Sequence, residues 1–318
     1  MNTKDKILFI LPHSIAGRLI VSSIKDGFET FGFECSFYDE IYGGEFLEEF
    51  SKKDYKYLIS YDFTAINLKI KNNIKVKTLN FFGDKIQDPH SGEGWDKLYN
   101  ELFSPDNLSF FWDKEDIKVE NNPQMIYLPH FVNTEIYKNL NLKKEFDVMF
   151  MGRLDTDYRL KTFESVLKKF KSVAYYSIER HYKDALSRLP EISKPLLIKA
   201  YQGFIDNEED MATAINKAKI VVNFNEQGTS SLNYRTIQTM ACETMHIGDY
   251  RKEGVEYFKE NYIYYKNLEE MLEKTEYYLA NLDSACKINK EIRKIIEKDF
   301  SHRAGAQAMI NFAHEKDF

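Results

Sequence analysis

The stretch Ala200–Asp249, AYQGFIDNEEDMATAINKAKIVVNFNEQGTSSLNYRTIQTMACETMHIGD, holds the alternation that decides the fold. Glu208–Ala218 has helical spacing and leads directly into the apolar run Ile220–Phe224, which is typical of a buried parallel strand. A second helical pattern covers Tyr234–Cys242, and Met245–Gly248 predicts another short strand. Strand, helix and strand in this order predict a mostly parallel sheet with right-handed crossovers.

The same alternation continues on both sides of this stretch. Upstream, FDVMFM at Phe146–Met151 predicts a first strand, and Gly152 follows it. The remaining elements expected around this sheet are a helix over Arg159–Phe170, strands at Val173–Tyr176 and Tyr262–Tyr265, and helix from Leu268 nearly to the end, in two pieces around Phe300–His302.

A separate set of apolar runs occupies the N-terminal part of the chain. A helix over Gly17–Phe31 separates the first two of its predicted strands, which are Lys6–Pro12, Phe33–Tyr38, Tyr57–Tyr61, Val76–Phe82, Leu108–Trp112 and Met125–Leu128. A polar, Asn/Lys-rich stretch lies between Pro129 and Glu145. The sequence therefore predicts an α/β protein with two doubly wound, Rossmann-like domains, over residues 1–140 and 141–298, and a terminal helical segment over 299–318.

Composition excludes several classes of protein. The 318 residues are 43% hydrophobic and 30% charged, which argues against a disordered or fibrous chain. The net charge of -6 argues against a general nucleic-acid partner, which needs a basic face. Three scattered cysteines (Cys35, Cys242 and Cys286) favour a reducing compartment. Neither a signal peptide nor a membrane span is found, so we expect a soluble, cytoplasmic protein.

Polar segments that directly follow predicted strands are the candidate ligand sites, because ligands bind at the carboxyl ends of parallel strands. In the segment 225–235, Gly and hydroxyl residues precede a predicted helix, whose free N–H groups and dipole favour an anion such as phosphate. Arg235 lies one turn into that helix, and Arg153 and Arg159 follow another strand. The three guanidinium groups would suit a diphosphate, while simple capping and surface ion pairs are the structural alternative.

Several motifs occur in a fixed order, namely Gly203-Phe204-Ile205, Ile220-Val221-Val222-Asn223, Ser231 with Arg235, and Gln238-Thr239-Met240-Ala241-Cys242. In this order they resemble the donor half of GT-B glycosyltransferases, and most closely the CgeB-like (spore-protein-like) group. LPHFVN at Leu128–Asn133 is similar to the interdomain segment of such enzymes, and FMGR at Phe150–Arg153 to the loop that opens their donor domain.

The resemblance implies the GT-B fold, with two Rossmann-like domains facing across a cleft and the last helix crossing back onto the first domain. It implies a nucleoside-diphosphate sugar as co-substrate, no cofactor and no metal, and retention of configuration. The acceptor would be a glycan, a protein or a lipid-linked sugar. The donor-binding residues that it implies are Gly152, Arg153, Arg159, Gly203, Phe204, Asn223, Asn225, Ser230, Ser231, Leu232, Arg235 and Gln238.

Three positions depart from the family pattern. Gln238 stands where an acid usually holds the donor ribose, Glu243 replaces a Gly, and Ser230 occupies the first acidic position. A glutamine still accepts and donates hydrogen bonds. These departures motivate two alternatives, a GT-B-shaped binding or structural protein of a coat or surface, and a sugar-nucleotide epimerase.

His13 and Asp84 are the catalytic residues that we predict in the first domain, with Asp62 as a further candidate. His13 follows the first strand, where it would act as a base or bind the sugar, although a structural loop histidine is the alternative. Asp155-Thr156-Asp157 is an Asp-x-Asp pair. Such pairs bind a metal in another glycosyltransferase fold, but here arginines and a helix dipole would neutralise the diphosphate, so we predict no metal.

Overall fold

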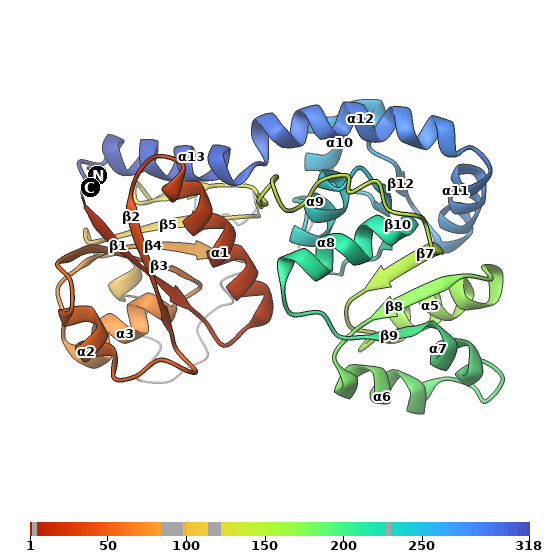
Figure 1. Cartoon of the computed structure of the whole chain (residues 1–318), viewed down its shortest axis with the longest axis horizontal. Helices are drawn as coiled ribbons and strands as arrows, with labels where there is room; N and C mark the ends of the chain where they lie inside the picture. The colour runs from red at the N-terminus through yellow and green to blue at the C-terminus, as the bar shows by residue number, and fades with distance from the viewer. Residues whose placement is uncertain (2–4, 84–97, 99, 114–121, 227–229) are drawn as a thin grey trace. The chain divides into compact units, whose positions relative to one another are not determined.

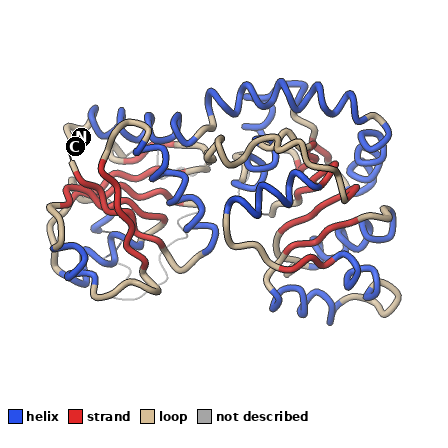
Figure 2. The backbone as a smooth tube through the Cα atoms, viewed as in Figure 1, coloured by secondary structure: helices blue, strands red, loops and turns tan. Residues whose placement is uncertain are grey.

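The structure is a computed structural model that describes residues 1, 5–83, 98, 100–113, 122–226 and 230–318. The chain divides into two compact units. Unit 1 comprises Met1–Asn133, Gln227–Ser231 and Asp299–Phe318, and unit 2 comprises Thr134–Glu226 and Leu232–Lys298. Figure 2 shows that in each unit the strands form a sheet with helices beside it.

Unit 1 is built on a six-stranded parallel sheet with the order β2-β1-β3-β4-β5-β6 (Figure 1). Its strands are β1 (Lys6–Leu11), β2 (Glu34–Asp39), β3 (Tyr55–Tyr61), β4 (Lys77–Phe82), β5 (Asn107–Phe111) and β6 (Met125–Tyr127). Its helices include α1 (Ile15–Glu29), α2 (Phe46–Ser51), α3 (Thr64–Asn72) and α13 (His302–Glu315).

Helices cover both faces of this sheet because its central strands, such as β1 and β3, are buried on both sides. On one face, the ring of Phe9 packs against Phe28 of α1 with 5.9 Å between centroids, and α13 packs against α1. On the other face, Leu8 and Leu58 pack with residues of α2 and α3. The C-terminal helix α13 thus completes the core of unit 1.

Unit 2 is a second six-stranded parallel sheet, with the order β12-β11-β10-β7-β8-β9 (Figure 1). Its strands are β7 (Phe146–Met151), β8 (Val173–Tyr176), β9 (Tyr201–Gly203), β10 (Ala218–Asn223), β11 (Met245–Asp249) and β12 (Tyr264–Tyr265). Its helices are α5 (Asp157–Lys169), α6 (Glu179–Arg188), α7 (Lys194–Ala200), α8 (Glu208–Lys217), α9 (Tyr234–Ala241), α10 (Lys252–Phe258), α11 (Leu268–Ala280) and α12 (Leu282–Asp299), with a 3₁₀ turn over Lys259–Asn261.

The main core of unit 2 forms where alternate side chains of the central strands meet the helices on one face. Phe150 of β7 stacks on Phe224 with 4.0 Å between ring centroids, and Phe163 of α5 packs beside them. Met271 brings α11 into the same core. The opposite side chain of β10, Asn223, instead contacts Asn233 and Thr236 at the start of α9.

The predicted α/β class with two doubly wound parallel sheets is confirmed. Elements that the sequence did not predict are short or polar. In α6, for example, only Ala185 is fully buried, with Tyr182 and Leu186 partly buried beside it, and in α2 only Phe46 is buried, so the apolar stripe of each helix is short. Within the described ranges, no helix is long and apolar enough to span a membrane.

Arg293 of α12 ties the start of unit 2 to the end of α9. Its guanidinium donates to the carbonyl oxygens of Tyr137 and Ala241, each at 2.6 Å, and of Thr134 at 3.0 Å. Because Arg293→Ala would leave three carbonyls without this donor, we expect the free energy of unfolding to fall by about 2–4 kcal/mol. Chemical denaturation measures this change.

Lys294→Ala is the matched control, because the neighbouring Lys294 side chain is exposed and, among the residues that the structure describes, pairs only with Glu291. It should change the free energy of unfolding by less than about 0.5 kcal/mol. Equal effects of the two substitutions would contradict the role given to Arg293.

Candidate functional site

The strand order of unit 2 reverses between β7 and β10. From β7 the chain continues to β8 and β9 on one side, whereas β10 pairs with β7 on the other side. At such a point the loops that leave the two strands diverge and open a crevice at the carboxyl edge, which is where α/β sheets bind ligands. The loops that follow Met151 and Asn223 therefore define the candidate site.

Gly152 turns the chain at the end of β7. Its φ of +147° lies in a region that side chains disfavour, and its N–H donates to the carbonyl of Tyr176 at 3.1 Å. Arg188 of α6 then holds the loop, because its Nη1 donates to the carbonyls of Leu154 and Asp155 at 3.1 and 3.0 Å. Arg188 was not predicted from the sequence, since only the fold brings α6 to this loop.

Two predicted arginines, Arg153 and Arg159, meet around one carboxylate. Arg153 Nε lies 3.4 Å from Asp155 Oδ2, and Arg159 Nη1 lies 3.2 Å from Asp155 Oδ1. Arg159 Nε also lies 3.1 Å from Glu226 Oε2, on the loop after β10. Glu226, which the sequence analysis gave no role, thus joins the two loops of the crevice. Two guanidinium groups and two carboxylates meet here, and a diphosphate would compete with the carboxylates for the guanidinium groups.

Arg235 reaches the same strand end from α9. Its Nη1 donates to the carbonyl of Met151, the last residue of β7, at 2.9 Å. Of its three side-chain nitrogens, only this one has a hydrogen-bond partner among the described residues, and Nε is buried. Burial lowers the pKa of Arg235 to about 10, so the group stays charged at neutral pH. Arg235 is half-buried, and a partly desolvated cation with unused donors is costly unless an anion joins it.

The segment before α9 differs from an open helix N-terminus. The Ser230 hydroxyl donates to Asp113 Oδ1 at 2.9 Å, Ser231 is fully buried, and the Leu232 N–H donates to the Glu253 carboxylate. Asn233 caps the helix by accepting from the Thr236 N–H at 2.9 Å. The protein itself therefore satisfies groups that we predicted for a phosphate.

Three further predicted donor-binding residues have structural contacts. The Asn223 amide donates to Asn233 and Thr236, each at 3.0 Å, and the Asn225 N–H donates to Asp249 at 3.1 Å. Gln238 is only 1% exposed, and its Nε2 donates to the Tyr137 hydroxyl at 2.6 Å. Gln238 lies one turn after Arg235 on α9, and its buried Oε1 has no hydrogen-bond partner among the described residues.

Gly203, the last residue of β9, and Phe204, which follows it, lie at the carboxyl edge of the same sheet. The Gly203 carbonyl accepts from the Ser177 N–H at 3.0 Å, and Gly203 has a φ of +97° that favours glycine. Phe204 is 45% exposed. An exposed ring at this edge offers a flat surface on which a nucleobase can stack.

In unit 1, the strand order reverses between β1 and β3. His13, just after β1, has a side chain that is 70% exposed and places Nε2 3.6 Å from Glu40 Oε2. Asp62, just after β3, has a φ of +53°, which is uncommon for a residue with a side chain, and its Oδ1 accepts from the Gly83 N–H at 3.3 Å. Asp84 lies outside the described residues.

Gly17 allows α1 to approach the ends of these strands. A Cβ atom on Gly17 would lie 2.7 Å from side-chain atoms of both Pro12 and Tyr61. The glycine therefore lets α1 start directly beside β1 and β3, where Ser14 caps it by accepting from the Gly17 N–H at 2.9 Å. His13 is thereby held at the carboxyl edge of this sheet.

The Asp-x-Asp pair is engaged by arginines. Asp155 contacts Arg153 and Arg159, and Asp157 Oδ1 accepts from Arg188 Nη2 at 2.8 Å. Across the part of the chain that the structure describes, no group of three His, Cys, Asp or Glu side chains is placed to hold a metal ion. Metal independence stays a prediction, because only a measurement of the activity itself can test it.

Part of the chain matches a known protein family. Residues 169–311 match the family model described as "Glycosyl transferase-like", which covers most of unit 2. No curated protein matches the chain in sequence.

Solved structures resemble the whole chain at low sequence identity. Sucrose-phosphate synthase from Thermosynechococcus elongatus is 13% identical, with a TM-score of 0.70 over 98% of this chain and 99% of that chain. A glycosyltransferase from Rickettsia africae is 14% identical, with a TM-score of 0.69 over 98% of both chains. An α-glucosyltransferase in complex with UDP and DNA is 13% identical, with a TM-score of 0.68 over 97% of this chain and 99% of that chain. The fold is therefore that of the GT-B glycosyltransferases, as predicted.

Arg235→Ala tests the site directly. Because the substitution removes a half-buried cation with unused donors, we expect it to weaken the binding of a nucleoside diphosphate by about 1.5–3 kcal/mol, or roughly 10- to 150-fold in Kd. Calorimetric titration with UDP, GDP and ADP measures this loss. Unchanged affinity would remove Arg235 from the site.

Glu226→Gln is the matched substitution, and we expect it to change the affinity for the nucleoside diphosphate in the opposite direction. It removes a carboxylate that pairs with Arg159 and preserves a hydrogen-bond acceptor for Thr156. The affinity for the diphosphate should rise by up to about 1 kcal/mol, as expected for a partly exposed ion pair. Since Arg235→Ala and Glu226→Gln act in opposite directions, general damage to the fold cannot mimic both results.

Proposed function

We propose that the protein transfers a sugar from a nucleoside-diphosphate sugar, with the donor bound at the crevice of unit 2. Arg235 carries the proposal, because its charged, half-buried guanidinium has two nitrogens without a partner in the described structure and lies at the strand reversal. The glycosyl transferase-like family model and the GT-B fold support it. The UDP held by the similar α-glucosyltransferase supports a UDP-sugar as donor.

Charge stabilisation is the main catalytic contribution in this proposal. When the bond between the anomeric carbon and the diphosphate breaks, negative charge grows on the leaving oxygen, and preorganised cations lower the barrier. Arg235, Arg153 and Arg159 are the groups that supply this charge. Phe204 would stack on the base, and the turn at Gly152 lets the backbone approach the phosphates.

The acceptor in this proposal binds to unit 1, near His13. We infer retention of configuration, in which the leaving diphosphate itself takes the proton of the acceptor hydroxyl, so that His13 orients a sugar hydroxyl. The acceptor classes that we propose are a glycan, a protein and a lipid-linked sugar. The CgeB-like resemblance supports this scheme only as a family analogy.

A second candidate function, sugar-nucleotide binding without transfer, is favoured by the contacts of three predicted donor-binding residues. Gln238 takes the position of the usual ribose-binding acid, yet it is buried and bonded to Tyr137. Ser230 and Leu232 are likewise occupied by Asp113 and Glu253. A protein that has lost transfer would bind the nucleotide but would not turn over the donor.

Donor turnover in excess EDTA separates these functions and tests metal independence. We expect hydrolysis or transfer from at least one UDP-, GDP- or ADP-sugar to persist undiminished in EDTA, because arginines neutralise the diphosphate. The released nucleoside diphosphate is measured by chromatography. Activity that is lost in EDTA and restored by Mn²⁺ or Mg²⁺ would place Asp155 and Asp157 around a metal, and binding without turnover would favour the second function.

His13→Ala tests the role of unit 1. If His13 orients the sugar, the affinity for the intact donor should fall by about tenfold, as for a lost hydrogen bond, while the affinity for the bare nucleoside diphosphate stays unchanged. Steady-state kinetics and calorimetry measure the two quantities. His314→Ala, which changes an exposed histidine of α13, is the control.

A different combination of changes in kcat and in donor affinity would assign His13 a different role. A fall in kcat of about 10²–10⁴-fold with unchanged donor affinity would identify His13 as a general base and would contradict retention. Wild-type kcat and KM for both substrates would return His13 to a structural loop residue.

A further inference from the structure

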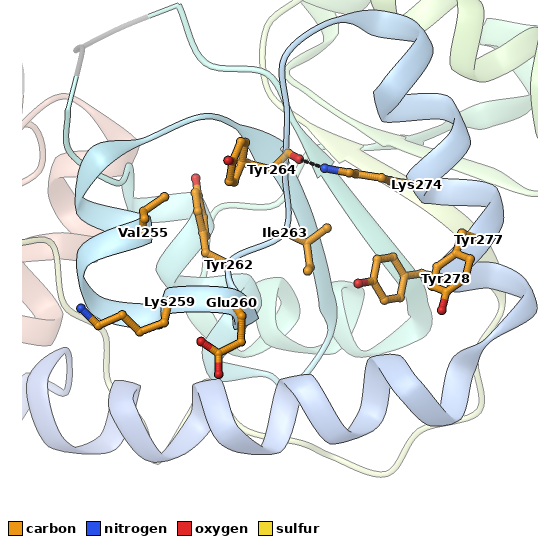
Figure 3. A pocket seen from close by; sticks show the side chains of 9 residues that line it. All are labelled: Val255, Lys259, Glu260, Tyr262, Ile263, Tyr264, Lys274, Tyr277 and Tyr278. Atoms are coloured by element: carbon orange, nitrogen blue, oxygen red, sulfur yellow. Dashed lines mark hydrogen bonds between the residues drawn. The ribbon is translucent and has the colours of Figure 1, made fainter.

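A pocket of about 560 Å³ lies at the β12 edge of the sheet in unit 2, well removed in strand order from β7. Figure 3 shows Tyr277 and Tyr278 of α11 on one side of it and Tyr262 and Tyr264, which flank Ile263, on the other. The arginines of the proposed donor site do not line this pocket. A ligand bound here would therefore occupy a second site.

The aromatic walls follow from the local sequence. On α11, Lys274, Tyr277 and Tyr278 are spaced by three and four residues, which places them on one face of the helix. The rings of Tyr277 and Tyr278 pack edge to face with 5.1 Å between centroids, and those of Tyr262 and Tyr264 stack at 5.9 Å. Tyr277 nevertheless remains 56% exposed. Tyr262 is only 3% exposed and Lys274 Nζ lies 5.2 Å over the Tyr264 ring, so Tyr277 and the partly exposed Tyr278 supply the uncovered aromatic surface.

Three tyrosine hydroxyl groups at this pocket are available to a ligand. The Tyr262 hydroxyl donates to the carbonyl of Asp249 at 2.9 Å. By contrast, the hydroxyls of Tyr264, Tyr277 and Tyr278 make no hydrogen bond to any other residue that the structure describes. Each of the three can both donate and accept. The lining therefore combines flat apolar faces with several free hydroxyl groups.

The charges around the pocket balance each other. Lys274 Nζ lies 2.7 Å from Glu270 and also donates to the carbonyl of Tyr264, so its charge is neutralised within the protein. The other charged lining residues are Lys259 and Glu260, one of each sign. With no excess of either sign, the pocket does not select an anion such as a phosphate or nucleotide.

We propose that this pocket binds a neutral oligosaccharide. The C–H face of a pyranose ring is apolar and stacks on tyrosine rings, while its equatorial hydroxyls match the free hydroxyls of the three tyrosines. The volume lies in the range of small-molecule sites and accommodates more than one sugar ring. The site goes beyond the proposed transfer reaction, which requires nothing at the β12 edge, and it would hold a glycan by a region away from the reacting group.

Titration with defined neutral trisaccharides tests the proposal. Maltotriose, cellotriose and triacetylchitotriose are added to the protein with saturating UDP present, and binding is followed by calorimetry and saturation-transfer NMR. At least one trisaccharide should bind at millimolar concentration. Tyr277→Ala should weaken that binding by about five- to tenfold, because a stacking face is lost, and Tyr277→Phe should weaken it less.

Tyr42→Ala is the matched control, because Tyr42 is an 83% exposed tyrosine of unit 1. It should leave trisaccharide binding unchanged, and thermal unfolding shows whether each variant is folded. The proposal is overturned if no trisaccharide of the panel binds, or if folded Tyr277→Ala binds as tightly as the wild type. UDP affinity is measured separately on the same samples, so a failure of the donor site is distinguishable from a failure of this one.

Discussion

One hydrogen bond, from Arg235 Nη1 to the carbonyl of Met151, fixes the candidate site at the strand reversal of unit 2. It joins α9, which follows β10, to the last residue of β7, so the two diverging loops are held at a set separation. The bond also keeps a guanidinium in a half-buried position with its other nitrogens unused. Such a group costs free energy when the site is empty, and binding an anion recovers part of that cost.

Much of the fold was predictable from the sequence, because parallel strands buried on both faces are short apolar runs. Phe146–Met151 and Val173–Tyr176 were predicted with the boundaries that the structure shows. The missed helices α6 and α2 are ten and six residues long and fully bury a single residue each, so their apolar pattern spans few positions. The strand β9 was missed as a strand for a similar reason, because it is three residues long and lies at the edge of its sheet.

The candidate site was predictable only for residues whose place is set by the strand end that they follow or approach in the sequence. Arg153, Arg159 and Arg235 follow or approach strand ends, and the structure gathers them at the end of β7. The partners of Ser230, Leu232 and Gln238 come instead from residues distant in sequence: Asp113, Glu253 and Tyr137. A sequence motif shows that a residue has a polar group, but it does not show which distant group already uses it.

The carboxylates of Asp155 and Glu226 give the arginine site a property that follows from the proposed chemistry. They hold Arg153 and Arg159 in place without a ligand, so the cations do not need to reorganise when a diphosphate arrives. The same carboxylates repel the diphosphate and compete with it for the guanidinium groups of Arg153 and Arg159. This competition limits how tightly the nucleoside-diphosphate product binds. An enzyme that releases a nucleoside diphosphate after every turnover needs both features, since interactions that bind substrate, transition state and product equally do not raise kcat. Arg235, which has no carboxylate partner among the described residues, is then the group that gains most from the charge that develops during transfer.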